Sequence, residues 1–172
     1  MALLPIIIAP DPRLRMKTVP VGQVDEAARV FMENMLETMY AANGIGLAAP
    51  QVGDDRSVIV LDCARKGEAP APIKMANPEI IEVSAEQKTH EEGCLSLPEH
   101  YAEVVRPKSI RMRYLDDTNI IRELNAEGTL ATCIQHEIDH LAGVLFIDHI
   151  SSLKRNMILR KLKKVKKQSS EN

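Results

Sequence analysis

The spacing of apolar side chains predicts three helices separated by a long run of strands. Residues 25–44 carry apolar side chains at the intervals of one helical face, namely Val30, Phe31, Met35, Leu36 and Met39. This rhythm ends at Gly44, as is typical of a helix C-terminus. A second helix is expected to begin near residue 129 and to run through residues 136–140, and a third occupies the end of the chain.

Strands are predicted between the first two helices. Residues 57–63, SVIVLDC, form an apolar run typical of a buried strand, with Cys63 at its end. Residues 64–127 show no long helical period, and the segments 74–88, 101–107 and 108–117 are predicted to be short strands separated by prolines and polar turns. The pattern predicts an α+β fold, with short antiparallel sheets around the second helix and a further helix near each end of the chain.

Length and composition favour one globular domain over residues 1–150. The chain has 172 residues, of which 45% are hydrophobic and 27% charged. No apolar stretch approaches the roughly 20 residues that span a bilayer, so no membrane partner is expected. The opening MALLPIIIAPDPRLR is briefly apolar, but it lacks a basic leader and contains three prolines. It is therefore predicted to be an extended segment and not a signal peptide, which favours a cytoplasmic location.

The net charge of the C-terminal segment differs sharply from that of the rest of the chain. Residues 151–172 carry a net charge of +7, against −9 for the rest. This segment is predicted to be a basic C-terminal helix that frays at its end. A basic helix can be a solvated, dispensable end or a contact to phosphate, and the pattern alone favours the former.

The segment HEIDH, residues 136–140, carries the candidate chemistry. His136 and His140 are spaced i and i+4, so both imidazoles lie on one helix face, where a single cation can bridge them. Glu137 lies beside that face and can exchange protons with water activated by the metal. The alternative is a solvated helix face, because a motif this short also occurs by chance.

Two histidines do not complete a catalytic metal site, and the residues that follow offer no third ligand. Phe146 occupies the position where one metalloprotease superfamily has a third histidine, and His149 comes three residues too late. Of the downstream acids, Asp148 is too close, and Glu171 lies in the fraying tail. The third ligand is therefore expected upstream.

Cys94 is the best upstream candidate among the three cysteines. Cys133 lies about 10.5 Å from His140 along the helix axis, too far for a shared ion, so it is expected to pack in the core. Cys94 lies in HEEGCLSLP, where Gly93 allows close backbone approach and Leu95 offers an adjacent backbone N–H.

Three segments together resemble the signature motifs of the peptide deformylases: GIGLAAPQ (44–51), EGCLSLP (92–98) and QHEIDHLAGVLF (135–146). The resemblance implies a divalent metal held by Cys94, His136 and His140, with ferrous iron expected in vivo and zinc, nickel or cobalt as possible substitutes. It also implies removal of the formyl group from the formyl-methionine of nascent polypeptides, in the bacterial cytoplasm or an organelle.

The resemblance also implies roles for individual residues. Glu137 would act as the general base, while the Gln51 amide and the Leu95 N–H would stabilise charge on the formyl oxygen. Gly46 would let the substrate backbone lie alongside as an added strand. Apart from the resemblance, Glu92 and Arg106 carry opposite charges and can pair to support the loop that carries Cys94, the alternative being an ordinary surface pair.

The methionine pocket would be lined by Ile45, His90, Thr129, Thr132, Cys133 and His136. Relatives commonly have bulkier apolar residues at positions 90, 129 and 132. The more polar lining here leads to the hypothesis that the pocket binds the methionine side chain more weakly.

Deformylases of this kind use a C-terminal helix to dock near the nascent-chain exit of the ribosome, which makes the ribosome a candidate partner for residues 151–172. Two alternative functions stay open: a related metalloamidase or peptidase with altered first-residue specificity, and an RNA-binding module with a structural metal.

Overall fold

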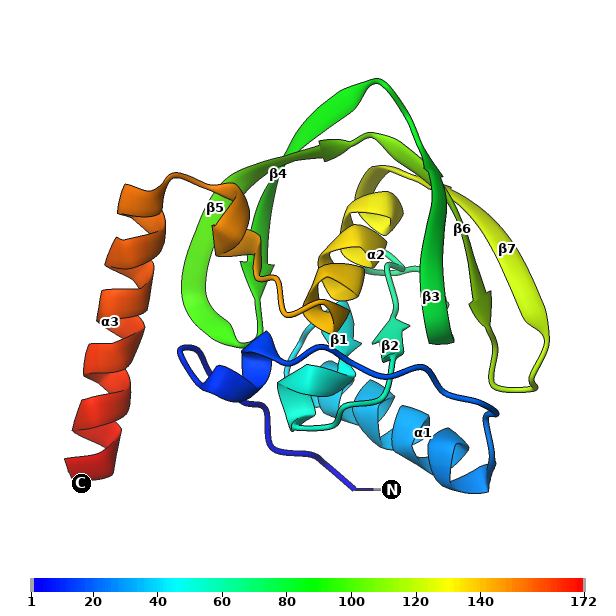
Figure 1. Ribbon diagram of the computed structural model, residues 1–172, viewed down its shortest axis with the longest axis horizontal. Coiled ribbons are helices and arrows are strands. Elements are labelled where there is room, and N and C mark those ends of the chain that lie inside the picture. Colours follow the sequence, from blue (N-terminus) through cyan, green and yellow to red (C-terminus); the bar gives the residue numbers. More distant parts are fainter. Residues whose placement is uncertain (1, 172) are drawn as a thin grey trace.

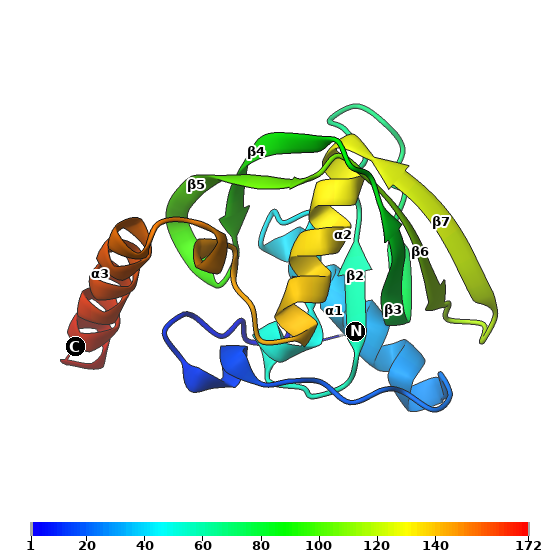
Figure 2. The same cartoon turned by 45° about the horizontal axis from the view of Figure 1, so that its top comes forward.

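Two antiparallel sheets surround a central helix (Figures 1 and 2). The computed structural model describes residues 2–171. Its α-helices are α1 (Glu26–Ala41), α2 (Gly128–Leu141) and α3 (Ser152–Glu171). The strands are β1 (Gly46–Ala48), β2 (Val58–Leu61), β3 (Ile73–Val83), β4 (Gln87–Cys94), β5 (Leu97–Pro107), β6 (Ser109–Leu115) and β7 (Ile121–Glu127). The predicted α+β class is confirmed.

The sheets divide the chain into two parts that meet at α2. Five strands form one sheet in the order β1-β2-β3-β6-β7, and β4 and β5 form a separate two-stranded ribbon. Every strand pair within these sheets is antiparallel. Helix α2, in yellow, lies in the space that the two sheets enclose, while α3 projects from the body beside the ribbon (Figure 1).

The residues at each end of helix α1 explain where it begins and where it ends. The Asp25 carboxylate accepts a hydrogen bond from the Ala28 N–H at 2.8 Å, which satisfies one of the free amides of the first turn. At the other end Asn43, and not Gly44, takes the left-handed conformation, with φ of 58°. Asn tolerates this conformation better than other non-glycine residues. The helix therefore ends at Ala41, earlier than the apolar rhythm suggested.

The strands of the hairpins are longer than the proline positions suggested. Strands β3 and β5 each have 11 residues. Pro78 does not break β3, because the pairing with β6 shifts register between Ala76 and Glu79 and the intervening Asn77 has a positive φ of 50°. A bulge thus accommodates a residue that cannot donate to the sheet ladder.

The core consists of three clusters of buried apolar side chains, and α2 lies among them. One lies under α1 and includes Met32, Met35 and Met39. A second joins β2, β3 and β6 to α2 and includes Ile134. The third joins the N-terminal segment to β5 and the 3-10 helix η3 (Phe146–His149), and includes Phe146 and Leu162 of α3. This packing fixes the position of α2, which carries HEIDH.

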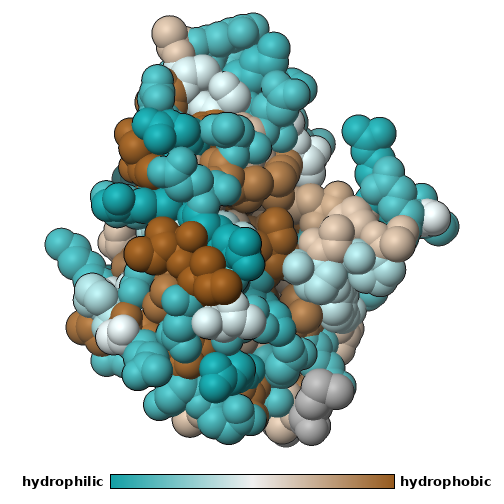
Figure 3. All heavy atoms as spheres, turned by 90° about the vertical axis from the view of Figure 1, so that its right-hand side faces the viewer, coloured by the Kyte–Doolittle hydropathy of each residue, from teal (hydrophilic) through white to brown (hydrophobic). Residues whose placement is uncertain are grey.

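Helix α3 is anchored by one face. Leu162 is only 4% exposed, and Ile158 and Leu159 pack against the same cluster, whereas its lysines lie exposed. Within residues 2–171, no helix combines the length and apolar character needed to cross a bilayer. The outer side of β3, β6 and β7, which faces the viewer in Figure 3, mixes hydrophilic atoms with separate hydrophobic patches.

Candidate metal centre and its pocket

Three potential metal ligands converge from two parts of the fold. Cys94 is the last residue of β4, and His136 and His140 lie one turn apart on α2. One ligand atom from each residue lies within 4.8 Å of the other two, and the Cys94 Sγ is 3.4 Å from the His140 Nε2. Cys133 does not belong to this group, and its Sγ instead donates to the Ile45 carbonyl at 3.6 Å.

The geometry of the three donors fits one divalent ion. Metal bonds of about 2.0 to 2.3 Å place the ligand atoms of one ion no more than about 4.6 Å apart, so donors that lie within 4.8 Å of one another can bind a shared ion after a small shift. Burial and neighbouring positive charges lower the pKa of His140 well below its usual value, which keeps this imidazole in the neutral form that binds metals. A thiolate and two imidazoles suit several first-row transition metals.

Glu92 orients His136 toward this centre. The His136 Nδ1–H donates to the Glu92 carboxylate at 2.9 Å, which leaves Nε2 of the same ring to face the metal position. Arg106 forms a two-pronged ion pair with Glu92, at 2.7 and 3.0 Å. Burial alone would raise the pKa of Glu92, but hydrogen bonds with His136 and Arg106 outweigh it and lower that pKa to about 2. The expected pairing of Glu92 with Arg106 is therefore present.

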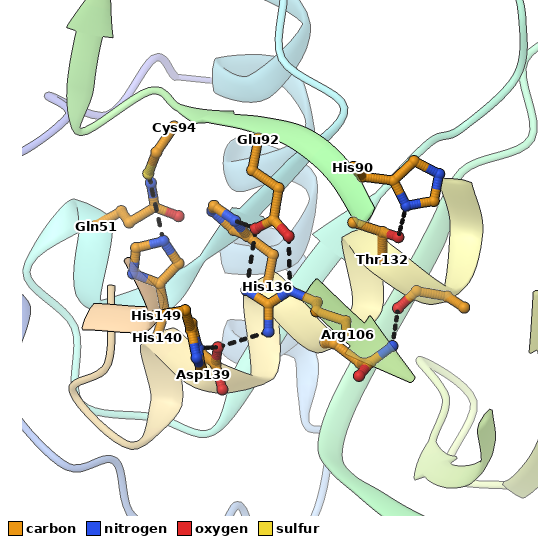
Figure 4. A network of polar contacts seen from close by, with 12 residues as sticks. Gln51, His90, Glu92, Cys94, Arg106, Thr132, His136, Asp139, His140 and His149 are labelled. Carbon is orange, nitrogen blue, oxygen red and sulfur yellow. Dashed lines mark hydrogen bonds and ion pairs between the residues drawn. The ribbon is translucent and has the colours of Figure 1, made fainter. Parts of the chain in front are cut away.

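The polar contacts continue from Arg106 to the surface (Figure 4). The Nη1 of Arg106 donates to the Asp139 Oδ2 at 2.9 Å, and the His149 Nε2 reaches the same oxygen at 2.8 Å. Asp139 lies on α2 between the two metal-site histidines and points away from the centre, toward Arg106. A continuous series of hydrogen bonds thus joins an exposed histidine to the metal side of α2.

Glu137 is a buried carboxyl group with an unpartnered oxygen. Its Oε2 has no hydrogen-bond partner among the described residues, and burial raises its pKa to about 7. A carboxyl group with a pKa near neutrality can both accept and deliver a proton. Glu137 packs beside Gly46 of β1, where a Cβ would come within 2.9 Å of the Cys133 Sγ and closer still to the Glu137 carboxylate.

Gln51 is held at the centre by three contacts and is only 1% exposed. Its Oε1 accepts from the Ala48 N–H at 2.9 Å, while its Nε2 donates to the Ser96 Oγ at 3.1 Å and to the Cys94 Sγ at 3.5 Å. Fixing the amide oxygen on Ala48 turns the amide N–H groups toward the thiol. Gln51 is thereby a fixed donor beside the metal position.

A cavity of about 520 Å³ opens beside these groups. Every residue that the sequence suggested for substrate binding lines it: Ile45, Gly46, His90, Glu92, Gly93, Thr129, Thr132 and Cys133. The suggested catalytic residues Gln51, Leu95 and Glu137 line it as well, together with the metal-site residues Cys94 and His136. His140, which is only 1% exposed, is not among the lining residues.

The lining has a polar pair where α2 faces β4. The His90 Nδ1 and the Thr132 Oγ1 lie 2.8 Å apart, in hydrogen-bond contact (Figure 4). This contact satisfies both groups within the wall, so neither is an isolated polar atom. The wall nevertheless offers less apolar surface than a pair of aliphatic side chains would.

Sequence reasoning missed three side chains of this region. Ser96 accepts from Gln51, and Asp139 and His149 extend the contacts of Arg106. No local pattern signals these contacts, because each joins segments that only the tertiary fold brings together. The position of Asp139 inside HEIDH was the one available hint.

Comparisons with known proteins place the chain within one family. The sequence model of the family described as polypeptide deformylase matches residues 3–156. A peptide deformylase of Mesorhizobium japonicum is 53% identical over 97% of this chain and 95% of its own length. One from Methylocella silvestris is 57% identical over 97% of this chain and 87% of its own length.

Solved structures show the same similarity in three dimensions. The crystal structure of a peptide deformylase from Ehrlichia chaffeensis superposes with a TM-score of 0.93 at 36% identity, covering 98% of this chain and 99% of that one. A peptide deformylase structure from Legionella pneumophila gives a TM-score of 0.90 at 42% identity, with 99% of each chain covered. The converging cysteine and histidines, the shared fold and the near full-length identity together show that this chain belongs to the polypeptide deformylase family, metal-dependent enzymes that remove the formyl group from nascent peptides.

Proposed function

We propose that Cys94, His136 and His140 bind the catalytic metal and that the adjoining cavity receives the formylated N-terminus of a new polypeptide. The observation that carries this proposal is the convergence of three donors beside Glu137, a buried carboxyl group with an unpartnered oxygen. The reaction is the hydrolysis of the formyl amide, which releases formate and leaves a free amino terminus.

Each side chain has a task that follows from its placement. When bound, the metal would supply a Lewis acid that lowers the pKa of water and polarises the formyl group. Glu137 takes the proton from the attacking water and later delivers it to the departing amine. The Gln51 amide and the Leu95 N–H donate to the formyl oxygen as negative charge develops on it, and loss of one such donor typically costs about 10²- to 10³-fold in rate.

The proposed metal is ferrous iron, with zinc, nickel and cobalt as alternatives. A donor set of one thiolate and two imidazoles suits all four ions, so availability selects among them. A thiolate beside ferrous iron is open to oxidation, which makes anaerobic preparation essential. Metal analysis of protein purified without oxygen tests the assignment, and iron far below one equivalent with zinc in its place would contradict it.

The deciding experiment measures formate release from a formyl-Met peptide under anaerobic conditions. Wild type should be active, should lose activity after chelation and should regain it with Fe²⁺. Glu137→Gln keeps the size of the side chain and should lower kcat by about 10²- to 10⁴-fold while still binding metal. Cys94→Ala should instead lose the metal. Equal activity in wild type and Glu137→Gln would overturn the proposed roles.

A structural metal in an RNA-binding protein is not supported by this geometry. Structural zinc sites have four protein ligands, and only Cys94, His136 and His140 converge among the described residues.

For the tail, we propose that α3 docks on the ribosome through its exposed basic residues, which would place the enzyme in the cytoplasm where formylated chains emerge.

A further inference from the structure

An exposed histidine is connected to the metal side of α2 by four successive pairs of hydrogen-bonded side chains. The series runs from His149 through Asp139, Arg106 and Glu92 to His136. Side-chain exposure falls from 36% for His149 and 25% for Asp139 to 6% for Arg106 and 4% for Glu92, and His136 at the inner end is 9% exposed. The last link, Glu92 to His136, fixes the ring of a proposed metal ligand.

A single carboxylate oxygen of Asp139 accepts two hydrogen bonds, and these two contacts fix the position of the carboxylate. Its Oδ2 accepts from Arg106 at 2.9 Å and from His149 at 2.8 Å. The buried guanidinium of Arg106 thus lies between two carboxylates, Asp139 on one side and Glu92 on the other. A planar guanidinium that binds both groups with directional hydrogen bonds transmits a change in the position of one to the other.

The segment that carries His149 also contacts the metal ligand directly. Phe146 begins η3, and its ring stacks on the His136 ring with centroids 6.1 Å apart and planes at 23°. Four residues form this 3-10 helix, and His149 is the last of them. The same short element therefore holds His136 from two directions, through ring stacking and through the series of hydrogen bonds.

We propose that His149 is a positioning residue for the metal centre. By holding Asp139, it fixes the Arg106–Glu92 pair and so keeps the Nε2 of His136 directed at the metal. Phe146 and His149, which lie downstream of HEIDH, thus contribute contacts to His136 and to the residues that support it. This inference rests on the proposed function only in that His136 is taken as a metal ligand.

The test compares His149→Phe with His149→Gln. The Phe variant keeps a ring but loses the donor to Asp139, while Gln can present an amide N–H near the position of the His Nε2. Loss of hydrogen-bonding support around metal ligands typically lowers metal affinity or activity about 10- to 100-fold. Because His149 acts through three intermediaries, we expect His149→Phe to weaken Co²⁺ affinity about tenfold, and His149→Gln to restore most of it.

The readouts separate positioning from general stability. Co²⁺ affinity is measured by competition with a chelator without oxygen, the visible spectrum of the bound Co²⁺ reports ligand geometry, and thermal unfolding of the metal-free protein reports stability. We expect a changed spectrum and a lower kcat at unchanged KM in His149→Phe, with little change in unfolding temperature. Unchanged affinity and spectrum, or an equal loss in His149→Gln, would overturn the proposal.

A failure of this inference can be told apart from a failure of the proposed metal site. Cys94→Ala is measured in the same Co²⁺ competition. If Cys94→Ala loses Co²⁺ binding but His149→Phe does not, the metal site stands and the role of His149 is refuted. If Cys94→Ala binds Co²⁺ as tightly as wild type, the assignment of the centre itself fails.

Discussion

Glu137 of α2 packs against Gly46 of β1 so closely that β1 has no room for a side chain at this position. A Cβ added at Gly46 would also lie 2.9 Å from the Cys133 Sγ. Neither Glu137 nor Cys133 can move freely, because both side chains are buried and both belong to α2. The position of the proposed general base is therefore set in part by the absence of a side chain on the strand opposite.

Gly46→Ala is expected to reduce activity more than stability. The added methyl group must displace Glu137 or β1, and overpacking of this kind costs about 1–3 kcal/mol of folding free energy. Because the base would move relative to the substrate, we expect kcat to fall about 10²-fold or more. Gly22→Ala is the matched control, since nothing lies within 4 Å of its added Cβ. Formate release and urea unfolding of both variants check this, and an active Gly46→Ala enzyme would contradict it.

The polar wall of the cavity should lower its affinity for the methionine side chain of a substrate. Replacing the hydrogen-bonded pair with aliphatic side chains, in the double variant His90→Ile and Thr132→Ile, adds apolar surface worth about 25 cal/mol per Å² of contact. We expect KM for a formyl-Met peptide to fall several-fold, with less change for a formyl-Ser peptide. Steady-state kinetics on the two peptides test this. A KM that stays the same, or rises for both peptides alike, would count against the idea.

Asp116 should contribute stability that depends on pH. Burial opposes its ionisation, but hydrogen bonds from Arg122, from the backbone of Ile120 and from Thr118 lower its pKa well below the usual value of 3.8. A carboxyl group whose pKa is lower in the folded state contributes its full stability above pH 3.8 and loses it as the pH falls through the folded-state pKa.

Asp116→Asn is therefore expected to be less stable than wild type at pH 7, by about 1 kcal/mol or less, because Arg122 is half exposed. The difference between the two should shrink as the pH is lowered below 3.8. Urea unfolding across this range measures it, with Asp55→Asn as control for an exposed carboxylate that has no side-chain partner among the described residues. A difference that grows toward acid pH would show that the sign is wrong.

Docking of α3 on the ribosome should depend on charge and not on its buried face. Lys163→Glu combined with Lys164→Glu changes two exposed residues and leaves Leu162 in the core. We expect co-sedimentation with ribosomes at low salt to fall about tenfold or more, while activity on a short peptide is retained. Lys66→Glu is a control at an exposed position outside the tail. Equal sedimentation of all variants would refute the docking proposal.

Sequence patterns were sufficient for elements whose residues interact locally. The apolar rhythm located α1, and the i, i+4 histidines indicated the face of α2 that meets Cys94, because both depend on helical periodicity. Proline positions were a poor guide to strand length, since the positive φ of Asn77 allows β3 to continue past Pro78. The apolar rhythm was expected to end at Gly44, whereas α1 ends at Ala41 and Asn43 takes the left-handed conformation that follows it.

Contacts between distant segments could not be read from the chain alone. The suggested site residues other than His140 line one cavity, but the roles given to them relied on the resemblance of three motifs to known enzymes. The link from Asp139 to Arg106 and His149 depends on how β5 and η3 pack together beside Asp139, and no periodicity encodes that arrangement. The roles of the individual residues remain predictions that the variants above test.

The proposed metal ligands come from a ribbon and a helix, and this division has a consequence for how the site forms. In the unfolded chain only His136 and His140 are near neighbours, and bringing Cys94 to them requires closing a long loop at a considerable entropic cost. The complete set of donors is therefore a product of the folded structure and not of local sequence. The three donors come together only once β4 has packed near α2, so full metal affinity depends on the tertiary fold and should be lost with it.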